Sequence, residues 1–303
     1  MGELPTADLL RRAQRVGILF GGGAARCAFQ IGVVEVLLEL GVVPAVCLGV
    51  SGGVWNAAAV AAGNAQRLRA YWRFFCRMPS VDARNLWREH SPFRWRQLHE
   101  RAFRRYVGVE RLAAAGAPTL LVGVTRLRDR ASLVLDATAH RDPFRLLLAS
   151  NYLPPFYTHA TVVDGERYGD AGFSDALPYG ALFEHGCDAV VVIAAKGESE
   201  GGLYRGPEDF DHQISAELLP RVVVIRPRHR LPLLFVERRW RRIEPIADLG
   251  ALRAREVLLG ESHAACDDAT SGVAWTLRLA RLRRMLLTAR SARRRRDRPR
   301  SPS

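Results

Sequence analysis

The sequence has no long hydrophobic segment. No apolar run approaches the roughly 18 residues that a membrane-spanning helix requires. The opening stretch, MGELPTADLLRRAQR, also lacks the apolar core of a secretory signal. We therefore expect a cytoplasmic protein with neither a signal peptide nor a transmembrane helix.

Recognisable metal-ligand spacing is missing as well. The five cysteines include no CxxC pair, and the eight histidines include no HxxxH or HExxH pair. These absences argue against a zinc site and against a disulfide framework. We expect reduced, mostly buried thiols, no metal and no cofactor.

Lysine is nearly absent, since Lys196 is the only one, and arginine carries almost all of the positive charge. Of the formal net charge of +14, residues 272–303 contribute +10, from eleven arginines against Asp297. The composition and spacing of this tail predict a basic amphipathic helix followed by a disordered, Arg-rich end. We expect it to contact an anionic membrane surface, which would make the protein peripheral there. A merely solvated end is the alternative, and nucleic acid is a less favoured partner.

The order of predicted elements indicates an α/β fold with a mainly parallel sheet. The hydrophobic pattern predicts strands over 16–20, 44–50, 119–125 and 131–136, a hairpin turning at Asp164-Gly165, strands in DAVVVIAA and RVVVIRP, and helices over 24–40, 53–62 and 248–267. We expect one domain over 15–271, preceded by an extension over 1–14 and followed by the tail.

Residues 64–107 are rich in Arg, Trp and Phe at helical spacing. Such a segment forms either an outer layer of the domain or a lid over an apolar site. The outer layer is the favoured interpretation, because aromatic stripes at this spacing are usually core.

One serine lies between glycines at the end of a predicted strand. Gly49-Val50-Ser51-Gly52-Gly53 fits the G-x-S-x-G nucleophile elbow, in which a strand turns sharply into a helix and exposes the serine. Flanking glycines remove side chains that would clash at such a turn. The helix that begins beyond Ser51 adds positive potential where an oxyanion would develop.

A second glycine cluster, Gly21-Gly22-Gly23, also separates a strand from a helix. It is not a P-loop, because no Gly-Lys-Ser/Thr follows, and Arg26 breaks the dinucleotide-binding pattern. Bare amides at a helix start suit an anion. If that anion is the oxyanion of a substrate attacked by Ser51, both clusters serve one reaction.

Ser51 needs a base to take its proton. A Ser-Asp-His order is conceivable, because His185, His212, His229 and His263 lie downstream. None of them sits in an informative motif, and Ser51 follows only two strands, which is early for an α/β-hydrolase. The candidate carboxylates of this half are Asp136, Asp164, Asp170 and Asp175. Asp164 suits a hairpin turn better than catalysis.

Two blocks of the sequence resemble the patatin-like phospholipase family. GGGAARCAFQIGVVEVLLELGVVPAVCLGVSGGVWNAA is similar to that family's oxyanion loop, helix, strand and elbow, and LLLASNYLPPFYTHATVVDGERYGDAGFSDALP to its second block. The resemblance implies a three-layer α/β/α fold and a Ser-Asp dyad without histidine. It implies that Ser51 is the nucleophile and Asp170 the base. It also implies an elbow flanked by Gly49 and Gly53 and an Asp-Gly-Gly/Ala-type motif formed by Asp170, Ala171 and Gly172. The oxyanion hole that it implies is formed by Gly21, Gly22, Gly23, Ala24 and Arg26.

Three positions depart from the family pattern. Many bacterial members have glycine where Ala24 and Cys27 stand, and Ala171 replaces the middle glycine of the second motif. The resemblance implies a lipid acyl hydrolase, of phospholipase A or lysophospholipase type, that cleaves carboxylic esters through an acyl-enzyme. The alternatives are a catalytically silent membrane-binding or scaffold protein and an acyltransferase.

Overall fold

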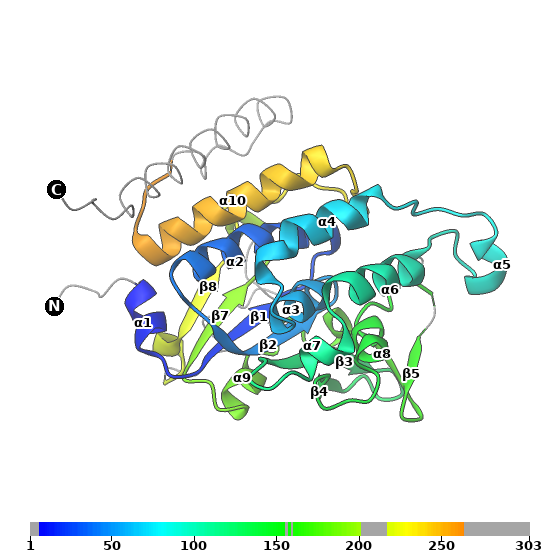
Figure 1. The fold of residues 1–303 in the computed structure, drawn as a ribbon, viewed down its shortest axis with the longest axis horizontal. Helices are drawn as coiled ribbons and strands as arrows, with labels where there is room; N and C mark the ends of the chain where they lie inside the picture. Colours follow the sequence, from blue (N-terminus) through cyan, green and yellow to red (C-terminus); the bar gives the residue numbers. More distant parts are fainter. Residues whose placement is uncertain (1–5, 155–156, 159, 201–216, 264–303) are drawn as a thin grey trace, which may run out of the picture.

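The computed structural model describes residues 6–154, 157–158, 160–200 and 217–263. Its centre is a sheet in the order β5–β6–β3–β2–β1–β7–β8, with β4 also paired to β3 (Figure 1). The strands are β1 Val16–Phe20, β2 Pro44–Val50, β3 Thr119–Arg126, β4 Ser132–Asp136, β5 Thr161–Val163, β6 Glu166–Asp170, β7 Ala189–Ile193 and β8 Val222–Ile225.

The five strands β3, β2, β1, β7 and β8 run parallel, whereas β4 and the β5–β6 hairpin add antiparallel pairs at the β3 edge. The α/β class with a mainly parallel sheet is thus confirmed. In the register of β1 and β2, Phe20 lies opposite Gly49. Because parallel strands end at one edge, the glycine cluster after Phe20 and the serine after Val50 emerge side by side.

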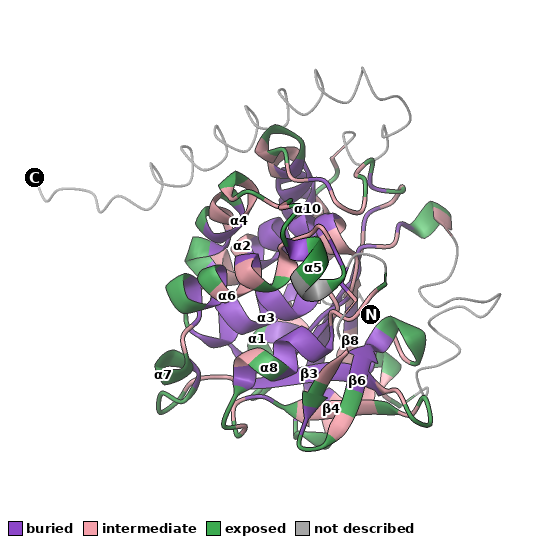
Figure 2. Ribbon diagram, turned by 90° about the vertical axis from the view of Figure 1, so that its right-hand side faces the viewer, coloured by how far each residue is buried: buried purple, intermediate pink, exposed green. Residues whose placement is uncertain are grey.

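Helices flank this sheet on both faces (Figures 1 and 2). They are α1 Thr6–Arg12, α2 Phe29–Glu39, α3 Gly53–Ala61, α4 Leu68–Arg77, α5 Asn85–Glu89, α6 Trp95–Tyr106, α7 Val109–Leu112, α8 Pro143–Ala149, α9 Gly180–Glu184 and α10 Trp240–Leu259, with short 3₁₀ turns at 24–28, 65–67, 171–173, 198–200 and 219–221. Within the described ranges no helix is both long and apolar enough to cross a membrane.

Successive side chains of the central strands pack into two different hydrophobic cores, one on each face of the sheet. Ile18 and Phe20 of β1 pack with α2, α3 and α10, while Leu19 between them packs with Leu182 of α9 on the other face. All four are essentially inaccessible to solvent. This alternation follows from the two-residue period of a strand, and it produces two apolar layers around one sheet.

The helices α2 and α10 cross in close contact. No side chain would fit at Gly32 or Gly250, because a Cβ on Gly32 would collide with the Ala247 carbonyl and one on Gly250 with the Phe29 carbonyl. Arg69 of α4 then joins the pair, since it bonds Glu35 of α2 at 2.5 Å and Asp248 of α10 at 2.8 Å. These contacts fix the helical layer that lies behind the glycine cluster.

The structure differs from the sequence-based prediction in two helices. The helix expected over 24–40 begins with a 3₁₀ turn over 24–28. The helix expected over 248–267 starts already at Trp240, with Pro245 inside it, and ends at Leu259 before Gly260, whose φ is +67°. The part of that prediction beyond residue 263, and all of the predicted basic helix and tail over 272–303, lie outside the described residues.

Candidate active site

Ser51 occupies a strained turn between β2 and α3. Its φ is +53°, in the left-handed region that L-residues other than glycine rarely adopt. The flanking glycines allow this turn, because a Cβ on Gly49 would collide with the backbone of Val54 and one on Gly53 with the Phe20 carbonyl. The turn places the Ser51 side chain at the carboxyl edge of the sheet, where it lines a cavity.

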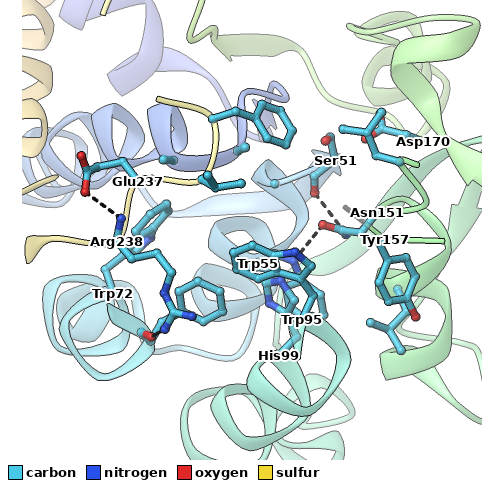
Figure 3. Close-up of a pocket in the computed structure, with 18 of the residues that line it drawn as sticks. Ser51, Trp55, Trp72, Trp95, His99, Asn151, Tyr157, Asp170, Glu237 and Arg238 are labelled. Carbon is cyan, nitrogen blue, oxygen red and sulfur yellow. Dashed lines mark hydrogen bonds between the residues drawn. The ribbon is translucent and has the colours of Figure 1, made fainter. Parts of the chain in front are cut away.

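Asp170 ends β6, where it pairs with Val124 of β3, and its side chain faces Ser51 (Figure 3). Burial raises the pKa of the Asp170 carboxyl to about 6, although the neighbouring Ser51 side chain and the Gly172 amide act in the opposite direction. The Gly172 amide donates to Asp170 Oδ1 at 2.8 Å. A carboxylate poised near neutral pH that faces a serine hydroxyl can accept that hydroxyl's proton.

The glycine cluster lies directly against the serine. A Cβ on Gly22 would be only 2.9 Å from the Ser51 Cβ. Two predicted oxyanion residues have their amides occupied, because Gly21 donates to Ile193 O at 3.0 Å and Arg26 to Gly23 O at 3.0 Å. The amides of Gly22, Gly23 and Ala24 donate to no acceptor within the described part of the chain. These three amides are the ones free to bind an oxyanion.

Only one of the three departures from the family pattern falls on a left-handed backbone. Ala24 has a φ of +48°, whereas Cys27 and Ala171 lie in 3₁₀ turns without a positive φ. The Cys27 thiol is buried, donates to Gly21 O at 3.6 Å, and has its pKa raised to about 12 by burial. Backbone strain therefore concerns Ala24 alone.

A buried polar network supports the glycine cluster, and the sequence alone did not predict it. Gln30 Nε2 donates to Gly21 O at 2.7 Å, Asn56 Nδ2 donates to Gln30 Oε1 at 2.7 Å, and Trp72 Nε1 donates to Asn56 Oδ1 at 2.8 Å. Gln30 and Asn56 have no exposed surface. Their signal in the sequence is one amide side chain on each of two mainly apolar helices, α2 and α3.

The cavity in front of Ser51 has a volume of about 840 Å³, including the space open to solvent at its mouth. Its walls are mainly aromatic, with Trp55 from α3, Tyr71, Trp72 and Phe75 from α4, Trp95 and His99 from α6, and Phe235 from the loop before α10 (Figure 3). The interpretation of residues 64–107 as an outer layer is correct only in part. Residues of this segment such as Phe103 and Tyr106 pack into the hydrophobic core, but Phe75 and Trp95 also line the cavity.

His99 is the histidine that faces this cavity, and no sequence signal pointed to it. Its ring stacks on Trp55 with the centroids 4.0 Å apart. Burial lowers the pKa of His99 to about 3, so the ring is neutral near pH 7. Its Nδ1 has no hydrogen-bond partner among the described residues. His99 therefore acts as part of the wall.

Asn151 joins the wall to the elbow. Trp55 Nε1 donates to Asn151 Oδ1 at 3.2 Å, and Asn151 Nδ2 donates to the Ser51 carbonyl at 3.4 Å. This side chain was not among the predicted site residues. It comes from the end of α8, in the second of the two blocks.

The remaining carboxylate candidates lie in a hairpin turn, at the end of β4 and in a loop. Asp164 has a φ of +48° in the predicted β5–β6 hairpin turn and faces His140 Nε2 at 3.3 Å. Asp136 and Asp175 each accept bonds from nearby backbone amides, those of Thr138 and Leu177. None of the three lines the cavity of Ser51. Over the described ranges, no cluster of three or more His, Cys, Asp or Glu side chains is arranged to hold a metal ion.

Comparison with known families agrees with this architecture. Residues 18–183, more than half of the chain, match the family model of the patatin-like phospholipases. The fold is thus that of a lipid acyl hydrolase family, and the chain belongs to the patatin-like phospholipases. The resemblance seen in the sequence is confirmed.

Other comparisons add less. No curated protein matches the chain. Among solved structures, the chain is similar to VipD from Legionella pneumophila, with 12% identity, a TM-score of 0.46, and coverage of 81% of this chain and 67% of that one.

Proposed function

We propose that this protein hydrolyses carboxylic esters of lipids, with Ser51 as nucleophile and Asp170 as general base. The observation that carries the proposal is the placement of Ser51 and the buried Asp170, which face each other in one aromatic cavity (Figure 3). A serine hydroxyl is a weak nucleophile until a base takes its proton. Among the described residues, two with carboxyl groups line the cavity, and of these Asp170 faces Ser51 whereas Glu237 bonds Arg239.

In the first half-reaction, Asp170 accepts the Ser51 proton while Ser51 Oγ attacks the ester carbonyl. The amides of Gly22, Gly23 and Ala24 stabilise the resulting oxyanion, and the start of α3 adds positive potential. Collapse of the tetrahedral intermediate breaks the ester bond. The alcohol leaves with the proton from Asp170, and an acyl group remains on Ser51.

In the second half-reaction, Asp170 activates a water that attacks the acyl-enzyme. The fatty acid is released, and the proton returns to Ser51. The aromatic walls suit an acyl chain, because they offer apolar surface with few polar groups to desolvate. We therefore infer a lipid ester as substrate, of phospholipase A or lysophospholipase type.

The test is turnover of a short-chain p-nitrophenyl ester by the wild type and by Ser51→Ala. The proposed function requires turnover by the wild type and its loss in the variant. Absence of turnover by the wild type would instead favour the silent scaffold. Added alcohols or lysolipids test acyl transfer, which would appear as new ester products.

A further inference from the structure

Residues 79–94 form a projecting finger between α4 and α6, which carries α5 at its tip (Figure 1). Its two arms are joined by the antiparallel bridge of Val81 with Phe93 and by a bond from the Arg94 amide to Ser80 O at 2.9 Å. The buried Asn85 side chain donates to Ser91 O at 3.1 Å and to Phe93 O at 2.6 Å. These internal bonds give the finger a defined shape.

The tip of the finger exposes large apolar side chains. Trp87 is 86% exposed, Val81 60% and Leu86 51%. Figure 2 shows α5 in front of the body of the molecule. A helix that turns Leu and Trp to solvent while it buries an asparagine has its polarity reversed relative to an ordinary surface helix. Such an apolar tip indicates a surface that is covered by a partner.

The finger and its base carry a positive charge, which favours an anionic partner. Residues 77–96 contain five arginines and two acidic residues. Among the described residues, Arg77, Arg84, Arg94 and Arg96 form no ion pair. Unpaired arginines beside an exposed Trp and Leu match the interface of an anionic bilayer, where Trp lies at headgroup level and arginines meet lipid phosphates.

The base of the finger is continuous with the cavity wall. Phe93 stacks on Trp95 with centroids 5.8 Å apart, and Trp95 stacks on Phe75 at 6.0 Å. Both Phe75 and Trp95 line the cavity that contains Ser51. Arg238, from the loop before α10, donates to Met78 O at 2.6 Å and to Phe75 O, at the end of α4 from which the finger starts. A membrane bound by the finger would therefore lie close to the cavity.

We propose that the finger docks this protein on anionic membranes by inserting Leu86 and Trp87 into the headgroup region. Membrane binding by these residues is argued from the shape, exposed apolar side chains and charge of the finger, and does not depend on the proposed function. Its consequence for catalysis, delivery of a bilayer lipid to the cavity, rests on the proposed function. The finger is distant in sequence from the basic tail over 272–303, which lies outside the described residues.

The experiment is cosedimentation of the full-length chain with vesicles of mixed phosphatidylglycerol and phosphatidylcholine. Leu86→Ser/Trp87→Ser should bind at least ~10-fold more weakly than the wild type, since the buried apolar area is lost. The matched control is Val43→Ser, because Val43 is 75% exposed but precedes β2, at the edge of the sheet away from Ser51. That variant should bind like the wild type.

A second measurement addresses insertion itself. Brominated lipids should quench part of the tryptophan fluorescence of the wild type, and Trp87→Phe should lose that part. Equal vesicle binding by the double variant, or unchanged quenching in Trp87→Phe, would overturn the proposal. Turnover of a soluble p-nitrophenyl ester is assayed in parallel and should be unchanged by both finger substitutions. Its absence in the wild type would refute the proposed function without affecting the vesicle result.

Discussion

The Ser51 amide donates a hydrogen bond to Ser150 Oγ at 2.8 Å, and that hydroxyl in turn donates to the Gly123 carbonyl at 2.7 Å. Ser150 has no exposed surface. One hydroxyl from the end of α8 therefore links the elbow after β2 to the neighbouring strand β3. This bond holds a residue with a positive φ in place, and such strain persists only where surrounding contacts enforce it.

Removing that hydroxyl tests the link. Ser150→Ala should lower the free energy of unfolding by about 1–3 kcal/mol, because buried polar backbone groups lose their partner. It should lower kcat by roughly 10- to 100-fold through misplacement of Ser51, with a smaller effect on KM. Steady-state kinetics and urea denaturation of the same preparation measure both effects. Unchanged kcat at reduced stability would show that Ser150 supports the fold alone.

Replacing the base separates catalysis from turn structure. Asp170→Asn should reduce kcat by at least ~10³, since an amide cannot accept the Ser51 proton. Asp164→Asn is the matched control, because asparagine also suits the positive φ of the hairpin turn. Ester turnover of the two variants decides between them. A large loss of kcat in Asp164→Asn with little change in Asp170→Asn would instead identify Asp164 as the base.

The ionised Asp170 carboxylate should lower the free energy of unfolding at neutral pH. Burial raises the pKa of Asp170 from 3.8 to about 6, so ionising it is harder in the folded chain than in the unfolded one. The folded state is favoured below pH 3.8, and that advantage is lost as the pH rises through 6. Asp170→Asn should therefore be more stable than the wild type at pH 8, by up to about 3 kcal/mol. Urea denaturation at several pH values checks this, and an equal difference at pH 4 and pH 8 would contradict it.

The rate should follow the same ionisation. Only the ionised Asp170 accepts a proton, so kcat/KM for a soluble ester should rise with pH through an apparent pKa of about 6. A pH–rate profile with a non-ionisable substrate measures it. An acid limb near pH 4 would mean that Asp170 is not the titrating base.

Glycine substitutions at Ala24 and at Cys27, two of the departures from the family pattern, should change the free energy of unfolding in opposite directions. Ala24→Gly should raise the free energy of unfolding by up to about 1 kcal/mol, because glycine accommodates the φ of +48°. Cys27→Gly should lower it, because Cys27 has no positive φ and its buried thiol would be lost. Thermal denaturation of both variants distinguishes them. Destabilisation by Ala24→Gly would show that the Ala24 methyl contributes packing in the cavity wall.

Local patterns in the sequence were sufficient for the strands and for the elbow. The apolar runs at 16–20 and 44–50 form β1 and β2 at the predicted bounds, and the Asp164-Gly165 turn forms as expected. In these segments the hydrophobic period and the turn residues agree with the final packing. The residues that complete the site are of a different kind.

Side chains that meet only in three dimensions were not predictable. Gln30, Asn56 and Trp72 come from three helices, and no local pattern pairs them. His99 reaches the cavity only because α6 packs beside α4. The start of α10 was missed because Pro245 normally limits a helix, whereas here Arg69 and the close contact with α2 hold the segment in place.

Labelling by a fluorophosphonate probe, followed by peptide mapping, tests the Ser51–Asp170 mechanism most directly. The probe reacts with serines whose hydroxyl is activated, and its phosphonyl group resembles the tetrahedral intermediate. We expect one modified peptide, carrying the label on Ser51, with labelling abolished in Ser51→Ala and strongly slowed in Asp170→Asn. Labelling of another serine, or no labelling of a folded wild-type chain, would contradict this mechanism.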